Sequence, residues 1–247
     1  MYGVAAEVFF APVKTAEHPY AEAAFLAHIG SAFVSVLNEE MKGPGPMKGN
    51  GQALAASINY TTPDFPLAIK AMYSTLKFDL DAPYNTKSKF NAYGLSIGNY
   101  FTHTLLAGVE YSYSKADSSN PLFPTITTKS KDYGLFAKYV HELEHGRELS
   151  FEGSLGTSKS DDGTENLSNT NVALAVDYFF NRSLSAGVGI ENSSGKDKDF
   201  EGRTYSTNVR YFITPRISVQ AKYDRFLNAN PGLYTEKSFG ATLAARF

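Results

Sequence analysis

The stretch that decides the fold is the end of the chain, Phe239-Gly-Ala241-Thr-Leu243-Ala-Ala245-Arg-Phe247. An apolar residue stands at every second position, with small or polar residues between them, and the final residue is aromatic. A period of two predicts a β-strand with two unlike faces. One face is suited to lipid and the other to a polar interior, which predicts the last strand of a transmembrane barrel.

The same alternation recurs along most of the chain and predicts about twelve strands in a single domain, residues 1–247. Several are longer than the roughly five or six residues typical of soluble strands and suit the roughly 9 to 11 of a tilted membrane crossing. We therefore expect an all-β, antiparallel transmembrane β-barrel, with ten strands as the alternative. The candidate strands are residues 2–12, 51–62, 67–81, 88–100, 102–115, 130–141, 146–158, 168–180, 182–192, 201–213, 215–226 and 236–247.

The connections between these strands alternate between short and long. Short ones fall near residues 100–103, 141–146, 178–182 and 211–216; the long, polar ones are 81–88, 116–129, 158–167, 192–200 and 224–237. Tight periplasmic turns and longer outer loops are the asymmetry of outer-membrane barrels. We therefore expect a periplasmic C-terminus and long loops outside the cell.

With its terminal alternation and the aromatic pairs Tyr178-Phe179 and Tyr211-Phe212 before tight turns, the chain resembles the porin-like Gram-negative outer-membrane β-barrel proteins. The resemblance covers most of the chain. It implies a multi-pass protein of the bacterial outer membrane, in contact with outer-membrane lipid and lipopolysaccharide. It also implies that the barrel-assembly machinery recognises the ending during biogenesis, through Phe239, Ala241, Leu243, Ala245 and Phe247.

The composition fits this reading and excludes others. The chain has 43% hydrophobic residues, 16 Tyr, 18 Phe, no Cys and a net charge of -2. Absent cysteines exclude disulfides and thiolate metal sites, and the charge offers no basic footprint for nucleic acid. A soluble β-sandwich would also alternate, but it would not show such long strands or an apolar outward set. Because Met1 leads directly into an alternating segment, we expect a mature sequence whose leader was removed or replaced.

Residues 14–50 depart from the alternation. Phe25, Ile29, Phe33 and Leu37 recur at four-residue spacing, and Gly43-Pro-Gly-Pro46 would end a helix. We expect a helical insert of about 20 residues that plugs or caps the barrel. Two alternatives stay open: a helix on the outer membrane face, or a periplasmic piece before a ten-stranded barrel.

Extending the alternation to every strand predicts a set of charged residues that face the lumen, because charges are costly against hydrocarbon. They either line a mildly cation-preferring pore or pair with one another in a closed interior. These lumen candidates are Glu7, Lys77, Asp79, Glu110, Lys138, Glu148, Glu152, Asp177, Glu191, Arg210, Lys222, Asp224 and Arg246.

No catalytic residue, metal site or cofactor is predicted. The stretch from His141 to His145 matches H-E-x-x-H, but it falls in an expected turn, and the zinc chemistry of that motif needs a helix. His18 and His28 are the two histidines away from the periplasmic side, and neither has an identifiable nucleophile beside it in sequence.

The sequence therefore predicts an outer-membrane barrel that allows passive passage of small solutes or ions through a narrow polar lumen. The insert and the loop at 121–128 would set the constriction. A structural or adhesion barrel with a closed lumen and loop-mediated binding is the alternative, and an outer-membrane lipid-modifying enzyme is a third. An enzyme is thus not the favoured reading.

Overall fold

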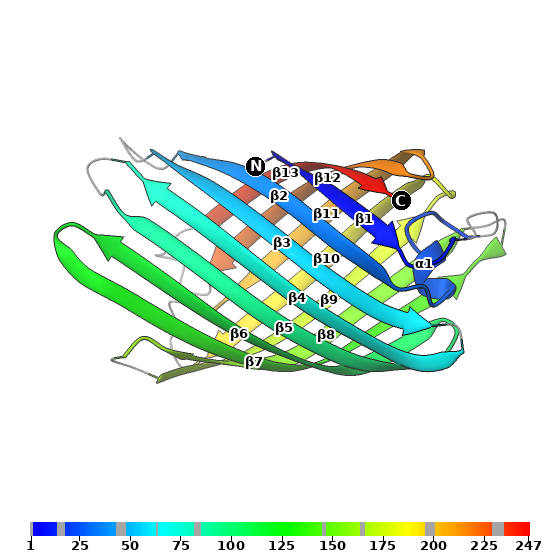
Figure 1. Ribbon diagram of the computed structural model, residues 1–247, viewed down its shortest axis with the longest axis horizontal. Coiled ribbons are helices and arrows are strands. Elements are labelled where there is room, and N and C mark those ends of the chain that lie inside the picture. The colour runs from blue at the N-terminus through cyan, green and yellow to red at the C-terminus, as the bar shows by residue number, and fades with distance from the viewer. Residues whose placement is uncertain are drawn as a thin grey trace.

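The computed structural model describes residues 2–13, 18–42, 48–62, 64–81, 85–144, 147–163, 166–195, 201–228 and 235–247. These residues form one closed barrel of thirteen strands with a single short helix, α1 at Ala23–Leu26 (Figure 1). The strands are β1 Tyr2–Phe9, β2 Ser31–Lys42, β3 Lys48–Thr62, β4 Phe65–Leu80, β5 Lys87–Thr102, β6 Leu105–Asn120, β7 Phe123–Glu142, β8 Glu148–Asp161, β9 Asn166–Phe179, β10 Leu184–Gly195, β11 Gly202–Thr214, β12 Ile217–Asn228 and β13 Thr235–Arg246.

Each strand pairs antiparallel with its neighbour in sequence, and the barrel is closed by β1 lying parallel to β13. The parallel register runs from Tyr2 opposite Ala241 to Glu7 opposite Arg246. Backbone hydrogen bonds from Phe9 N to Phe247 O and from Phe247 N to Glu7 O, both 2.8 Å, extend this seam. Closure leaves no unpaired sheet edge, as a barrel in lipid requires.

The described residues form thirteen strands where about twelve, or alternatively ten, are expected, and the expected helical insert of about 20 residues is only the four-residue α1. Residues 31–42 form β2, paired with both β1 and β3. Four-residue spacing is also a multiple of two, so Phe33 and Leu37 share one face of a strand as readily as one face of a helix. Between them Val34 is 44% exposed on the outer face, and β-branched residues favour a strand. Among the described residues, no helix is long and apolar enough to cross a membrane.

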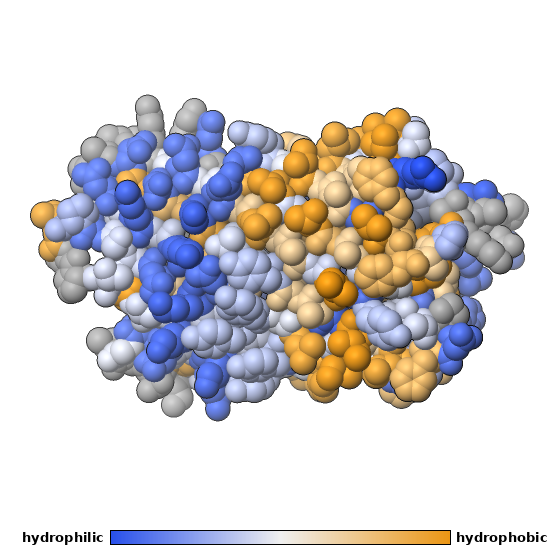
Figure 2. Space-filling model, in the orientation of Figure 1, coloured by the Kyte–Doolittle hydropathy of each residue, from blue (hydrophilic) through white to orange (hydrophobic). Residues whose placement is uncertain are grey.

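The outer wall of the barrel is apolar over about half of its length. Val188, Leu174 and Val209 are exposed there, while their neighbours in sequence face inward. Figure 2 shows apolar residues gathered over the half nearer α1 and hydrophilic residues over the other half. An apolar outside with a polar inside inverts the arrangement of a soluble barrel and suits a barrel set in lipid.

The two ends of the barrel differ. The short connections lie at the end that also carries α1 and the C-terminus, here called the short-turn end, and the long connections lie at the opposite, long-loop end (Figure 1). Residues 121–128 were expected to help narrow the lumen, but they do not fold inward. They continue the β6–β7 hairpin, with Asn120 opposite Phe123 and Leu122 81% exposed.

Candidate functional site

The lumen holds a cavity of about 740 Å³ whose wall combines small, aromatic and charged side chains. The alternation of the strands places these charges, because every second residue of each strand faces inward. Cations and carboxylates are mixed around the wall. The charged lining residues are Lys70, Lys138, Lys222, Arg246, Glu7, Glu110, Glu152, Glu191 and Asp224.

Part of this charge is neutralised by ion pairs across or along the strands. Arg246 Nε lies 3.1 Å from Glu7 Oε2, and Lys222 Nζ lies 3.0 Å from Asp224 Oδ1. Within the described part of the chain, the remaining lining residues Lys70, Glu110 and Glu191 have no ion-pair partner. The wall therefore presents both closed pairs and charges that are free to meet a solute. Two of the three unpaired groups are acidic.

Residues 18–30, here called the inner segment, lie across the short-turn end and form part of the cavity wall through Ala21, Ala24, Phe25 and Ile29. Tyr20 fastens the start of this segment. Its backbone N–H donates to Arg182 O at 3.0 Å, its carbonyl accepts from Arg246 Nη1 at 2.8 Å, and its ring packs edge-on against Phe212.

A buried ion pair joins the inner segment to the barrel wall. Lys138 Nζ lies 2.8 Å from Glu22 Oε2 and 2.9 Å from Glu152 Oε1, so one ammonium group serves both carboxylates. The Glu22 side chain is only 7% exposed. Lys138 also lies 4.9 Å from the centre of the Phe25 ring, a cation–π contact. Removing one partner of such a pair leaves the other charged and poorly solvated.

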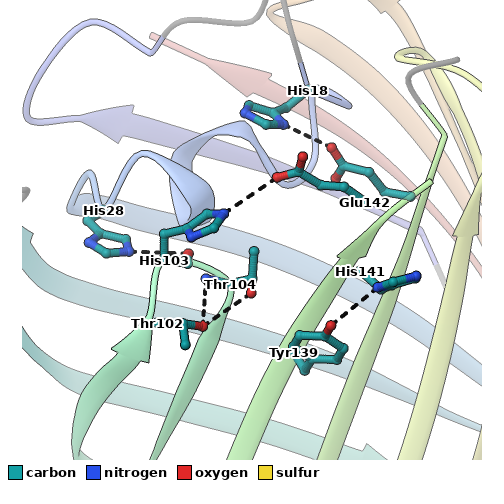
Figure 3. Close-up of polar contacts among 9 residues, drawn as sticks. His18, His28, Thr102, His103, Thr104, Tyr139, His141 and Glu142 are labelled. Carbon is teal, nitrogen blue, oxygen red and sulfur yellow. Dashed lines mark hydrogen bonds and ion pairs between the residues drawn. The ribbon is translucent and has the colours of Figure 1, made fainter. Parts of the chain in front are cut away.

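Two histidines hold the ends of the inner segment (Figure 3). His18 Nδ1 lies 2.9 Å from Glu148 Oε1, and the Glu148 side chain is 2% exposed. His28 stacks on Tyr100, with ring centres 3.8 Å apart, and its Nε2–H donates to His103 O at 3.3 Å. Burial lowers the pKa of His28 below its usual value, so the neutral ring is favoured in this position.

The described part of the H-E-x-x-H stretch, residues 141–144, forms no α-helix, because its first two residues belong to strand β7. His141 is the last but one residue of strand β7, and its Nδ1 lies 3.2 Å from the Tyr139 hydroxyl (Figure 3). His145 lies outside the described residues. Among those that are described, no group of three or more His, Asp or Glu side chains could hold a metal ion.

The predicted lumen residues fall into three groups. Eight line the main cavity: Glu7, Glu110, Lys138, Glu152, Glu191, Lys222, Asp224 and Arg246. Three others are inward but held locally. Glu148 lies beneath the inner segment, Asp177 accepts from Asn208 at 3.1 Å, and Arg210 donates to Gln220 at 3.4 Å.

Lys77 and Asp79 differ from the expectation, because they face outward. The register places Lys77 opposite Lys89, on the same face of the sheet as Tyr93, which is 55% exposed. The apolar residues of β4 change face along the strand. Near the short-turn end Ile69 lies outside, whereas toward the long-loop end the outer wall is hydrophilic and Leu76 turns inward.

Sequence reasoning missed two charged residues of the site. The alternation of Leu67, Ile69 and Ala71 in the first half of β4 would have assigned Lys70 to the lumen. Glu22 carries no such signal, because only the fold brings it to Lys138.

Solved structures with similar folds include an outer membrane protein, a porin and a toluene transporter. The outer membrane protein Omp33 of Acinetobacter baumannii is 18% identical and has a TM-score of 0.51, with 89% of this chain and 81% of that chain covered. The KdgM porin in complex with disordered oligogalacturonate is 11% identical, at a TM-score of 0.48, with 78% and 91% covered. The Pseudomonas putida toluene transporter TodX is 8% identical, at 0.45, with 81% and 74% covered.

A search of curated proteins gives no match. A family model described as "Putative general bacterial porin" matches residues 1–247. This match agrees with the closed barrel, its apolar outer wall and its charged lumen, and it indicates an outer-membrane channel. The chain therefore belongs to this family of bacterial porins of the outer membrane.

Proposed function

We propose that the protein is a narrow, passive channel for small solutes and ions, with the inner segment as its constriction. The observation that carries this proposal is the cavity of about 740 Å³, lined by nine charged residues. Cavities of about 300–1,000 Å³ suit small molecules. Charged and hydroxyl groups along the wall would replace part of the hydration shell of a passing solute.

The channel prefers cations mildly in this proposal. The paired charges largely cancel for a passing ion, so the unpaired residues Glu110, Glu191 and Lys70 dominate the selectivity. Two carboxylates against one ammonium group attract cations and repel anions. The buried Glu22 beside Lys138 adds to the acidic balance.

The proposed orientation puts the long-loop end outside the cell and the C-terminus in the periplasm, as in other outer-membrane barrels. The inner segment then faces the periplasm. The apolar ending of β13 supports recognition by the barrel-assembly machinery, because Phe239, Leu243 and Phe247 all point outward and are exposed.

Single-channel recording in planar bilayers tests the channel. We expect discrete current steps and a reversal potential that shows cation preference in a salt gradient. Glu191→Gln lowers this preference, because Glu191 lines the cavity. Glu40→Gln is the matched control, since it removes the same charge from the exposed outer side of β2. Equal shifts in both variants, or no current steps at all, would refute a lumenal pathway.

A closed structural or adhesion barrel is the second candidate, and the docked inner segment favours it. Contacts of Tyr20, Glu22 and His28 hold that segment across the short-turn end. In that case the protein conducts no current, even after the inner segment is loosened. Binding would then be carried by the long loops.

A further inference from the structure

The outer wall near the long-loop end carries lysines in an unusual arrangement. Three pairs of lysines among the described residues of β4 to β8 lie directly opposite each other on adjacent strands, and together they are here called the lysine collar. The pairs are Lys77 with Lys89, Lys115 with Lys129, and Lys131 with Lys159.

The collar faces the membrane side of the wall. Its residues share the outward face with Tyr93, Tyr111 and Tyr133, which are all exposed. Tyr111 and Tyr133 form an aromatic pair, with ring centres 5.2 Å apart. Tyrosine rows of this kind mark the boundary between the hydrocarbon and the headgroups.

The lysines begin just beyond that boundary. Lys131 lies two residues nearer the long-loop end than Tyr133, on the same face of β7. Lys115 likewise lies two residues nearer that end than Tyr113 on β6. Two strand residues span roughly 7 Å, or roughly 5 Å along the membrane normal in a tilted strand. The collar is therefore at the height of lipid headgroups. Figure 2 shows the hydrophilic surface beginning where the apolar region ends.

The wall supplies too few carboxylates to neutralise this charge. Asp117 lies opposite Lys89 in the strand register, contacts Lys115 at 2.9 Å and also accepts from Thr127 at 2.7 Å. Asp79 lies opposite a further lysine, Lys87, and Asp161 lies opposite Lys129. Like charges that face each other across two strands are destabilising. A multivalent anion at this height would remove that repulsion.

We propose that the lysine collar binds the phosphate groups of lipid A, the membrane anchor of lipopolysaccharide. This proposal rests on the orientation given under Proposed function, which puts the long-loop end in the outer leaflet. Lipid A presents phosphates at the headgroup level and acyl chains below them. It can therefore contact the collar and the apolar wall at the same time. A groove of about 340 Å³ offers its phosphates a recess, and the charged residues that line it are Lys77, Lys87, Lys89, Asp79 and Asp117.

Titration of diphosphorylated lipid A into the detergent-solubilised, folded protein tests the proposal. The variant Lys89→Gln/Lys115→Gln/Lys131→Gln removes one lysine from each pair. We expect binding roughly 100-fold weaker, or about fivefold per lysine removed. The matched control is Arg147→Gln/Arg182→Gln/Arg216→Gln, which removes three charges at the short-turn end and leaves the affinity unchanged. Each variant is verified as folded if its unboiled sample migrates faster on a gel than its boiled sample.

Further lipids and conditions separate the sources of binding. EDTA in all samples removes any divalent cation that could bridge Asp79, Asp117 or Asp161 to phosphate, and binding persists if lysine contacts carry it. Dephosphorylated lipid A binds at least tenfold more weakly if the phosphates are recognised. Equal binding of the dephosphorylated lipid or of phosphatidylglycerol, or an equal loss in the control variant, overturns the proposal. Single-channel currents of the collar variant remain those of the parent, so absent currents would count against the channel and not against the collar.

Discussion

Releasing the inner segment from the barrel wall is expected to open the channel. The perturbation is Glu22→Gln, which removes the carboxylate that lies 2.8 Å from Lys138 Nζ. Loss of a partner from a fully buried ion pair costs about 3–5 kcal/mol. Here Lys138 keeps Glu152 at 2.9 Å, so the cost is closer to that of one charged hydrogen bond, about 1.5–3 kcal/mol.

This loss of docking energy is expected to change the fraction of time for which the channel is open. A loss of about 1.5–3 kcal/mol from the docked state raises the ratio of open to closed states roughly 10- to 150-fold. The measurement is the open probability in single-channel recordings at fixed voltage and salt. A channel that is open about 1% of the time would then be open for roughly 10–60% of it.

The matched control is Glu152→Gln. It removes the other carboxylate from the same ammonium group, but Glu152 belongs to β8 and not to the inner segment. Lys138 then retains Glu22, so the open probability stays low. A bis-maleimide bridge between Tyr20→Cys and Phe212→Cys, whose rings are 5.6 Å apart, is expected to suppress the open events. Equal open probabilities in Glu22→Gln and Glu152→Gln would refute the constriction by the inner segment.

Three further outcomes follow from the lumen, the histidines and the outer wall. Lys70→Gln is expected to raise the cation permeability and lower the anion permeability by up to about fivefold each, since a unit charge about 4 Å from an ion in water contributes about 1 kcal/mol; an unchanged reversal potential would contradict this. Because burial lowers the pKa of His28, the released segment binds a proton more readily than the docked one, so docking weakens as the pH falls below the ordinary pKa of histidine. The open probability should therefore rise on acidification, and His28→Gln should flatten this part of the profile; identical pH profiles would exclude the role of His28. Val188→Lys, on the exposed outer wall, should lower the free energy of unfolding in lipid vesicles by up to about 2–4 kcal/mol, whereas Ser206→Lys in the lumen should not; equal losses would contradict the assignment of the two faces.

The sequence predicted the barrel well because alternation is a local signal. Each residue needs only its neighbours two positions away to show which face it shares, and most strands of the structure follow that pattern. The exception is β2, where Phe25, Ile29, Phe33 and Leu37 repeat every four residues. Such spacing fits both a helix and a strand. The outward residues Val34 and Val36 were the only local sign that β2 is extended.

Faces and contacts between distant elements were harder to predict. The assignment of Lys77 failed because β4 runs past the apolar half of the wall, so its apolar residues change from the outer face to the inner one. Alternation alone does not show at which residue of β4 the apolar side chains change from the outer face to the inner one. The pair of Glu22 and Lys138 joins residues from the N-terminal segment and β7, and no sequence pattern encodes their meeting.

Arg246 contacts both the seam that closes the barrel and the inner segment. Its guanidinium contacts Glu7 across the parallel seam, donates to the carbonyl of Tyr20 on the inner segment, and lies 4.9 Å from the centre of the Phe212 ring. Glu7 and Tyr20 come from the first strand and the segment after it, whereas Arg246 comes from the last strand. None of the contacts between them can form until the final strand is in place. The seam is a short parallel pairing, slightly less stable per residue than an antiparallel one, so it gains most from such a contact. The docked inner segment therefore stabilises the closed barrel, and any state in which this segment has left the lumen also has a weaker seam.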